Sequence, residues 1–203
     1  MSIIGNVSGK QMNLLGQELP PGLILLNNWL SDDEHANAVA EVDNNHFETM
    51  LLRRVQHYGA RYDYESSQVS EIGSAPPIPP VLKSIGERLF SEDFFERSPE
   101  QVIVNEYFSG QGIASHVDRQ SFGSAVATIS LLESWPMIFS KTDGTKKLEV
   151  LLEVKSLAVM TMESRSEWAH EIAKRKVDKI GGLKIARCRR LSLTYRTINP
   201  KTF

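Results

Sequence analysis

The stretch Arg190-Leu-Ser-Leu-Thr-Tyr-Arg196 alternates strictly between apolar and polar side chains, a pattern typical of a β-strand. One face would carry Leu191, Leu193 and Tyr195. The other face would carry Arg190, Ser192, Thr194 and Arg196. In an isolated strand such a polar face is usually solvated. It would also suit a dicarboxylate, because guanidinium groups bind carboxylates bidentately and keep their charge.

Further short strands are predicted from residue 101 onward. Turn signals at Ser109-Gly-Gln-Gly112, Asp143-Gly144 and Gly181-Gly182 separate many of them. The predicted strands are Gln101–Tyr107, Ala125–Leu132, Pro136–Ser140, Leu148–Val154, Ser156–Met162 and Arg190–Ile198. Strands at this spacing predict a β-sandwich or barrel.

The N-terminal half is predicted to be helical and rich in loops. Leu23–Leu26 suits a buried strand, and Thr49–Gly59 has extended character. Helices are predicted from Ser31 to about Val42 and over about Val81–Phe95, the second after a proline-rich segment. We therefore expect a single domain over residues 1–203, with a loose arm at 1–20, a helical and lid portion at 21–100, and a β core at 101–198.

The composition is that of a soluble globular protein, with 203 residues of which 41% are hydrophobic and 24% charged. No run approaches the roughly 18 apolar residues of a membrane span, so no membrane partner is expected. The N-terminal residues lack the features of a secretory signal, which predicts a cytoplasmic protein (nuclear in a eukaryote) that is not secreted. The single cysteine, Cys188, excludes an intrachain disulfide framework, and we expect a monomer.

The stretch Ile113-Ala-Ser-His116-Val-Asp118 contains a His-x-Asp motif after a glycine-containing loop. In an extended segment residues two apart point the same way, so His116 and Asp118 can face one metal ion. A distant histidine would complete a two-histidine, one-carboxylate triad, which leaves three positions open on iron(II). Of the candidates His35, His46, His57 and His170, only His170 lies downstream in the β core. The motif alone is weak evidence, and a structural His116 is the alternative.

The predicted strand Gln101–Tyr107 places Ile103, Asn105 and Tyr107 on one face. An amide and a phenol on a buried face need partners, and a bound co-substrate can supply them.

Taken in order, these elements resemble the AlkB family of iron(II)- and 2-oxoglutarate-dependent dioxygenases over roughly residues 50 to 198. The matching elements are Asn105-Glu-Tyr107, His116-Val-Asp118, Glu163-Ser-Arg165 leading to His170, and Arg190 to Arg196. The resemblance implies an α+β fold that is mainly β, with a double-stranded β-helix (jelly-roll) core, N-terminal helices and a substrate-recognition lid. It implies that His116, Asp118 and His170 bind Fe(II). It also implies that 2-oxoglutarate is held by Asn105, Tyr107, Arg190, Ser192, Thr194 and Arg196, with one arginine on each carboxylate, and that O₂ is the oxidant.

A closer likeness points to the tRNA-modifying branch of AlkB homologues, in which the domain hydroxylates a wobble-uridine side chain. It rests on Arg53-Arg-Val-Gln-His-Tyr-Gly59 and on the five-residue step from Arg165 to His170. Three departures are notable: Glu171 stands where many members have glycine, Ser192 where an amide is frequent, and Gln120 where DNA-repair members have an acid. Efficient repair of charged alkyl-adenine lesions is therefore less expected.

The expected reaction is hydroxylation or oxidative demethylation of a modified or alkylated base in RNA, tRNA or single-stranded DNA. The residues predicted to bind substrate are Arg54, His57, Tyr58, Gln120 and Arg165, of which Arg165 has support of the lid as the alternative. His57 and Tyr58 would stack on the base, or else form a half-buried strand pair. Basic runs at positions 53–61 and 174–190 are either solvated faces or phosphate contacts. The alternatives are the same chemistry on a protein side chain, lipid or small metabolite, and a non-catalytic binding module.

Overall fold

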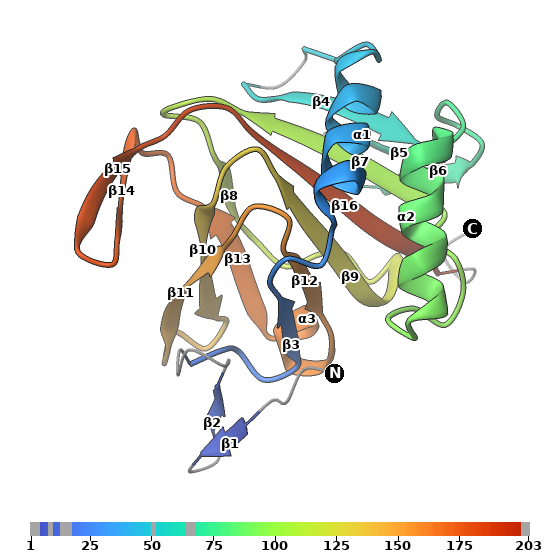
Figure 1. The fold of residues 1–203 in the computed structure, drawn as a ribbon. Coiled ribbons are helices and arrows are strands. Elements are labelled where there is room, and N and C mark those ends of the chain that lie inside the picture. The colour runs from blue at the N-terminus through green and yellow to red at the C-terminus, as the bar shows by residue number, and fades with distance from the viewer. Residues whose placement is uncertain (1–4, 8–9, 13–17, 50–51, 64–67, 200–203) are drawn as a thin grey trace.

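The structure is a computed structural model that describes residues 5–7, 10–12, 18–49, 52–63 and 68–199 (Figure 1). Two antiparallel sheets dominate it. The larger has six strands, in the spatial order β3 (Leu23–Leu26), β12 (Leu157–Met160), β9 (Phe122–Leu131), β16 (Arg190–Ile198), β7 (Gln101–Tyr107) and β4 (Arg54–Tyr58). The smaller has four, in the order β11 (Lys147–Leu152), β10 (Trp135–Lys141), β13 (Trp168–Ile172) and β8 (Ile113–His116).

Three helices and three two-stranded sheets complete the described chain. The helices are α1 (Asp32–Asp43), α2 (Pro80–Ser91) and α3 (Met162–Ser166). The small sheets pair β1 (Gly5–Val7) with β2 (Lys10–Met12), β5 (Ala60–Asp63) with β6 (Gln68–Ile72), and β14 (Val177–Ile180) with β15 (Leu183–Ala186). None of the described helices is long and apolar enough to cross a membrane.

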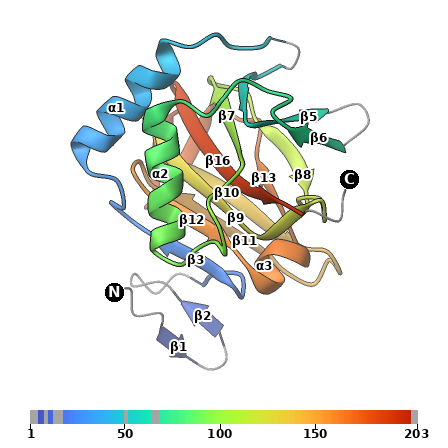
Figure 2. The ribbon, with the colours of Figure 1, turned by 90° about the vertical axis from the view of Figure 1, so that its right-hand side faces the viewer.

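The hydrophobic core has two layers, one on each face of the larger sheet. Helices α1 and α2 cover one face, as Figures 1 and 2 show, and their apolar side chains pack with Leu191, Leu193 and Tyr195 of β16. The Tyr195 hydroxyl donates a hydrogen bond to the Leu82 carbonyl of α2 over 2.9 Å. On the other face, apolar residues of the larger sheet pack against Trp135, Phe139 and others of the smaller sheet. The two facing sheets are the expected jelly roll.

Strand β16 lies at the centre of the larger sheet and carries the predicted separation of faces. It pairs with β9 on one side and β7 on the other, with Arg190 opposite Tyr107 and Ser192 opposite Asn105. The polar face turns inward, and Arg190, Ser192 and Thr194 are each at most 7% exposed. The alternative of a solvated polar face is therefore wrong for this strand.

The structure of the N-terminal half differs from the predictions in three respects. Strands β3 and β4 form the two edges of the larger sheet, through pairing with β12 and β7, so the core extends well before residue 101. In the predicted loose arm, Gly5–Val7 pairs with Lys10–Met12, while residues 1–4, 8–9 and 13–17 lie outside the described part. The second helix begins at Pro80 and ends at Ser91, before the predicted Phe95, because the chain turns at Asp93 with a positive φ of 62°.

Candidate metal centre

The His-x-Asp motif and the distant histidine come together between the two sheets. His116 ends β8 and lies directly opposite His170 of the neighbouring β13, and their ring centroids are 4.4 Å apart. Asp118 follows in the loop after β8, with its Oδ2 3.6 Å from His170 Nε2. One ligand atom from each of the three residues lies within 4.8 Å of the others. The structure thus groups the predicted triad.

The protonation states of the three side chains suit a divalent metal ion. Burial alone would raise the pKa of Asp118, but the charge of Arg196 above all, together with the nearby histidines, lowers it well below its usual range. Burial lowers the pKa of His170 to about 4, so its imidazole is neutral at pH 7, as metal binding requires. His116 Nδ1 lies 2.8 Å from the Ala114 carbonyl, which assigns the proton to Nδ1 and leaves Nε2 for a metal.

One oxygen of Asp118 identifies the place of the metal. Oδ1 accepts a hydrogen bond from Arg196 Nη2 at 2.7 Å. Oδ2 is buried and has no hydrogen-bond partner among the described residues. A buried, ionised oxygen without a partner is costly, and a metal ion between the carboxylate and the two imidazoles would satisfy it. The donor set of two nitrogens and one oxygen fits Fe(II).

Arg190 provides a second indication of a ligand site, in this case for an anion. Its side chain is fully buried, with Nη2 donating to Ser130 Oγ at 2.8 Å and its guanidinium 5.7 Å from the Tyr107 ring centroid. Its Nε has no partner, and no acidic side chain of the described chain forms an ion pair with it. Burial lowers the pKa of Arg190 to about 10, so it remains charged at neutral pH. A buried cation without an anion fits one carboxylate of 2-oxoglutarate.

The other residues predicted to hold the co-substrate lie on the same inward face. Ser192 lies between Asn105 of β7 and Ser130 of β9 in the register, and Thr194 comes two residues later. Asn105 Oδ1 accepts a hydrogen bond from Arg53 Nε at 2.8 Å. Tyr107 is buried, which raises the pKa of its phenol and keeps it protonated. These groups offer the donors that a dicarboxylate needs.

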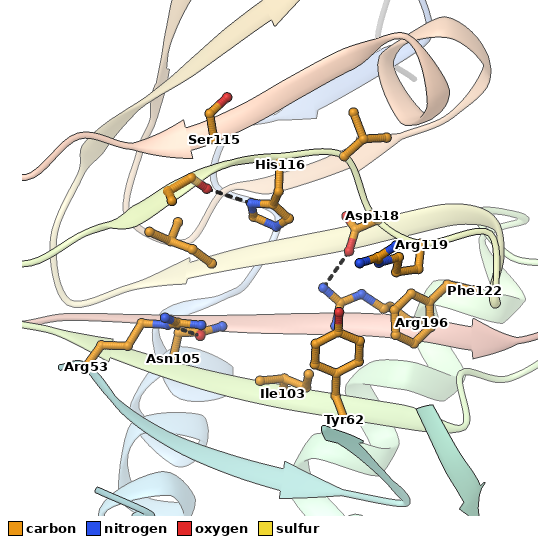
Figure 3. Close-up of a pocket in the computed structure, with 13 residues that line it drawn as sticks. Arg53, Tyr62, Ile103, Asn105, Ser115, His116, Asp118, Arg119, Phe122 and Arg196 are labelled. Atoms are coloured by element: carbon orange, nitrogen blue, oxygen red, sulfur yellow. Dashed lines mark hydrogen bonds and ion pairs between the residues drawn. The ribbon is translucent and has the colours of Figure 1, made fainter. Parts of the chain in front are cut away.

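A cavity of about 420 Å³ opens beside the triad. Figure 3 shows His116 and Asp118 on one side of it and Ile103, Asn105 and Arg196 on the other. Tyr62 and Phe122 also line it, with ring centroids 6.0 Å apart, and the Arg196 guanidinium lies 4.6 Å from the Phe122 ring centroid. Sequence reasoning missed this aromatic pair, although Tyr62 lies in an apolar–polar alternation just after Gly59 that could have indicated it.

Two predicted substrate residues lie on the wrong face of the sheet. Arg54 is opposite Glu106 of β7, and its Nη2 binds Glu106 Oε1 at 2.9 Å on the helix-covered side. Tyr58 is opposite Val102 and packs in the core beneath α1 and α2. Because successive side chains of a strand alternate between faces, neither residue reaches the cavity. The prediction that Arg54 and Tyr58 contact the substrate is therefore wrong.

Of the other predicted substrate residues, His57 is buried and Gln120 is exposed. His57 shares the face of Ile103, but it is only 4% exposed and its Nδ1 lies 3.2 Å from Glu48 Oε1. Such burial fits the alternative of a strand residue packed in the protein better than stacking on a base. Gln120 is exposed two residues after Asp118 and does not line the cavity, so its contact with substrate stays a prediction.

Arg165 supports the iron-binding loop. Its Nη1 donates to the Asp118 carbonyl at 2.8 Å, and its Nη2 donates to the Arg119 carbonyl at 2.6 Å. Burial lowers the pKa of Arg165, although Asp118 opposes that change. The structure thus shows Arg165 holding the backbone that carries Asp118, and its predicted contact with substrate stays a prediction.

Replacing Arg165 with methionine should weaken Fe(II) binding by about 10-fold to 100-fold, because groups that orient a metal ligand typically contribute that much. The overall fold should remain, since the bonds lost are confined to one loop. Anaerobic Fe(II) titration measures the affinity, with Glu163→Gln on the exposed side of α3 as the control. Unchanged iron affinity in Arg165→Met would show that the loop holds its shape without this side chain.

Comparison with known proteins agrees with this geometry. The family model described as "2OG-Fe(II) oxygenase superfamily" matches residues 22–196. A mouse (Mus musculus) protein named "tRNA (carboxymethyluridine(34)-5-O)-methyltransferase ALKBH8" is 33% identical over 189 residues, which cover 89% of this chain and 28% of the relative. An Arabidopsis thaliana "Alkylated DNA repair protein ALKBH8 homolog" is 31% identical over 212 residues, covering 92% of this chain and 61% of that protein. The chain thus spans less than two thirds of either relative.

Solved structures show the same fold. "The structure of OsALKBH1" superposes with a TM-score of 0.67 at 19% identity, covering 89% of this chain and all of that one. A Pseudomonas putida prolyl-4-hydroxylase superposes with a TM-score of 0.58 at 17% identity, covering 88% of this chain and 94% of that one.

Proposed function

Because the chain belongs to the 2OG-Fe(II) oxygenase superfamily, and is a dioxygenase that uses Fe(II), 2-oxoglutarate and O₂, we propose that its substrate is a modified base in RNA. The reaction would be hydroxylation of a carbon attached to the base, or demethylation where that carbon is bonded to nitrogen. The relatives named for tRNA and for alkylated DNA support a nucleic acid, and the tRNA name favours RNA. The observation that carries the proposal is the cavity with aromatic residues beside the triad.

Different residues of the site would bind the iron, bind the co-substrate and orient the metal ligands. His116, Asp118 and His170 would hold the iron, and Arg190 would hold the far carboxylate of 2-oxoglutarate. When bound, iron and 2-oxoglutarate together supply the oxidising power that places one oxygen atom of O₂ on the substrate carbon. Arg196 keeps Asp118 ionised and oriented through the bond to Oδ1. The packed sheets on either side exclude water from the reacting groups.

Tyr62 and Phe122 would position the base. Both line the cavity on the side away from His116, and an unpaired base gains about 1–3 kcal/mol by stacking on an aromatic ring. Tyr62 belongs to the β5–β6 hairpin, which directly follows strand β4 of the larger sheet in the chain. We therefore assign the stacking on the base, which was predicted for His57 and Tyr58, to Tyr62.

A basic hairpin supplies a surface for the phosphate backbone. The arginines of the late basic cluster already have acidic partners or are buried: Arg175 and Arg187 bind Asp178, and Arg189 binds Glu106. The lysines remain exposed and form no ion pair within the described chain: Lys174, Lys176, Lys179 and Lys184. Figure 1 shows the β14–β15 hairpin projecting from the two sheets.

The hairpin also places like charges against each other. Lys179 of β14 lies directly opposite Lys184 of β15, on the same face. Like charges at directly opposed positions destabilise a strand pair, and a bound polyanion would relieve the repulsion. This arrangement supports a nucleic-acid partner over a neutral metabolite.

Replacing both Lys179 and Lys184 with glutamine should weaken binding of single-stranded RNA several-fold at physiological salt. The slope of log affinity against log salt should become shallower by about 1.4, because each phosphate contact to a single strand contributes about 0.7. Fluorescence anisotropy from 50 to 300 mM salt measures the RNA affinity and its salt dependence. Lys83→Gln on α2 is the control. An unchanged slope would leave the hairpin as a solvated face.

Turnover tests the proposed function itself. The loaded enzyme is incubated with total tRNA, single-stranded DNA and a peptide pool, and succinate formation is compared with that of His116→Ala. We expect RNA-dependent succinate and a mass change of one oxygen atom, or loss of a methyl group, in a digested nucleoside. Turnover with peptide and with neither nucleic acid would favour a protein substrate.

A further inference from the structure

Arg119 occupies an unusual position in the cavity. It directly follows the metal ligand Asp118, and its side chain is exposed and lines the cavity. Figure 3 shows it beside Asp118 and Phe122. Its guanidinium forms no hydrogen bond or ion pair with any described residue, although the arginines on either side of the site, Arg165 and Arg196, are both engaged.

The backbone that carries Arg119 is held rigidly. Its carbonyl oxygen accepts hydrogen bonds from the Phe122 amide at 3.1 Å and from Arg165 Nη2 at 2.6 Å. The preceding carbonyl, that of Asp118, accepts from Arg165 Nη1 at 2.8 Å. A fixed backbone that bears an unengaged guanidinium next to a reactive centre reduces the entropy lost when that guanidinium binds a ligand.

The charges around the cavity favour an anionic ligand. The lining residues include three arginines, Arg53, Arg119 and Arg196, and a single acid, Asp118, which Arg196 already binds. A doubly charged iron ion and a doubly charged 2-oxoglutarate would cancel each other and leave this excess unchanged. A cationic alkylated base would find no free carboxylate on the cavity wall, whereas an anionic group would find a guanidinium.

We propose that Arg119 is a specificity-determining residue that binds an anionic oxygen of the substrate close to the carbon that is oxidised. The ligand is a carboxylate on the base or the phosphate next to it, since both offer the paired oxygens that a guanidinium fork binds. The enzyme accordingly selects anionic or neutral substrates over cationic alkylated bases. The inference rests on the proposed nucleic-acid substrate and adds a rule for which base is chosen.

The experiment uses an acid and its neutral counterpart. The probes are 5-carboxymethyluridine and its methyl ester, each as the free nucleoside and within a single-stranded RNA pentamer. A fifth probe is the same pentamer with cationic 1-methyladenosine. Anaerobic binding to the protein loaded with Fe(II) and 2-oxoglutarate gives affinities without turnover, and aerobic assays give kcat and KM. The variants are Arg119→Gln, Arg119→Lys and the surface control Lys83→Gln.

We expect Arg119→Gln to bind the probes about 10-fold more weakly and to show a KM about 10-fold higher, with kcat little changed, and Arg119→Lys to recover part of the loss. If the ligand is the carboxylate, the loss appears with the acid nucleoside and is absent with the ester. If the ligand is the phosphate, both uridine pentamers weaken equally and the nucleosides do not. In either case the wild type binds the 1-methyladenosine pentamer more weakly than the uridine pentamers, and Arg119→Gln narrows that gap.

Two results would overturn the inference. Wild-type binding that Arg119→Gln leaves unchanged with every probe would remove Arg119 from substrate recognition while the proposed function stands. No binding of any probe by wild type would overturn the proposed function, and this inference with it.

Discussion

Replacing Arg190 with methionine is expected to weaken 2-oxoglutarate binding by about 100-fold or more and, at the same time, to make the ligand-free protein more stable. Arg190 is fully buried, and the only hydrogen bond of its side chain within the described chain is from Nη2 to Ser130 Oγ. Replacing even a buried ion pair with apolar side chains of similar volume is often neutral or stabilises a fold by about 1–4 kcal/mol, and Arg190 has no counter-charge among the described residues to offset its burial. The Ser130 hydroxyl loses a donor, which costs about 1 kcal/mol and leaves a net gain.

Ligand binding should change in the opposite direction. A buried guanidinium that binds a carboxylate bidentately contributes at least about 2.7 kcal/mol, so the Kd for 2-oxoglutarate should rise about 100-fold or more. Thermal unfolding with and without Fe(II) and 2-oxoglutarate measures both effects, because only the wild type gains stability from the co-substrate. Arg190→Lys is the control that keeps the charge and loses the fork. A methionine variant that is less stable without ligand and still binds 2-oxoglutarate would contradict this role.

Replacing Arg196 with glutamine should damage the iron site and make iron binding depend on pH. Arg196 Nη2 donates to Asp118 Oδ1 at 2.7 Å, and its charge lowers the pKa of that buried carboxyl. Without this charge, burial would raise the pKa of Asp118, and a proton would compete with the metal. We expect iron affinity to fall about 10-fold to 100-fold at pH 7, and kcat/KM to fall by at least the same factor.

The sign of the pH effect follows from the direction of the shift. In the wild type the lowered pKa of Asp118 stabilises the folded state above the usual carboxyl pKa of 3.8, and that contribution is lost as the pH falls through the folded-state value. In Arg196→Gln the carboxyl takes up its proton at higher pH, so iron affinity should decline from pH 8 to pH 6 more steeply than in the wild type. Anaerobic Fe(II) titrations at pH 8, 7 and 6 measure this, with Arg196→Lys expected to restore part of the wild-type behaviour. Parallel pH profiles would argue against the coupling.

The parts of the fold that the sequence predicted best are those whose alternation is unambiguous. Strands β7 and β16 have the predicted bounds, because apolar and polar residues alternate along β16 and the run of β7 is flanked by clear breaks. His116, Asp118 and His170 could be grouped because two of them lie two residues apart and the third was the only histidine downstream in the β core.

The register of β4 could not be predicted in the same way. Its sequence, Arg54-Val-Gln-His-Tyr58, has apolar side chains three residues apart and two polar residues between them, so alternation does not assign a face. The structure buries Gln56 against the Val42 and Asn45 carbonyls, and a shift of one residue would exchange every face. His35 of α1 is a similar case, because its Nε2 accepts a hydrogen bond from the Leu132 amide at 3.2 Å. Such contacts depend on elements that are distant in sequence.

The visible charge-transfer band that forms when Fe(II) and 2-oxoglutarate bind under anaerobic conditions tests the iron site most directly. It is recorded for the wild type and for His116→Ala. We expect a band in the wild type that the variant lacks, because chelation of iron by the co-substrate needs the complete triad. His46→Ala, which changes an exposed histidine away from the triad, should retain the band. A folded wild-type protein without any band would contradict the assignment of this site as an iron and 2-oxoglutarate centre.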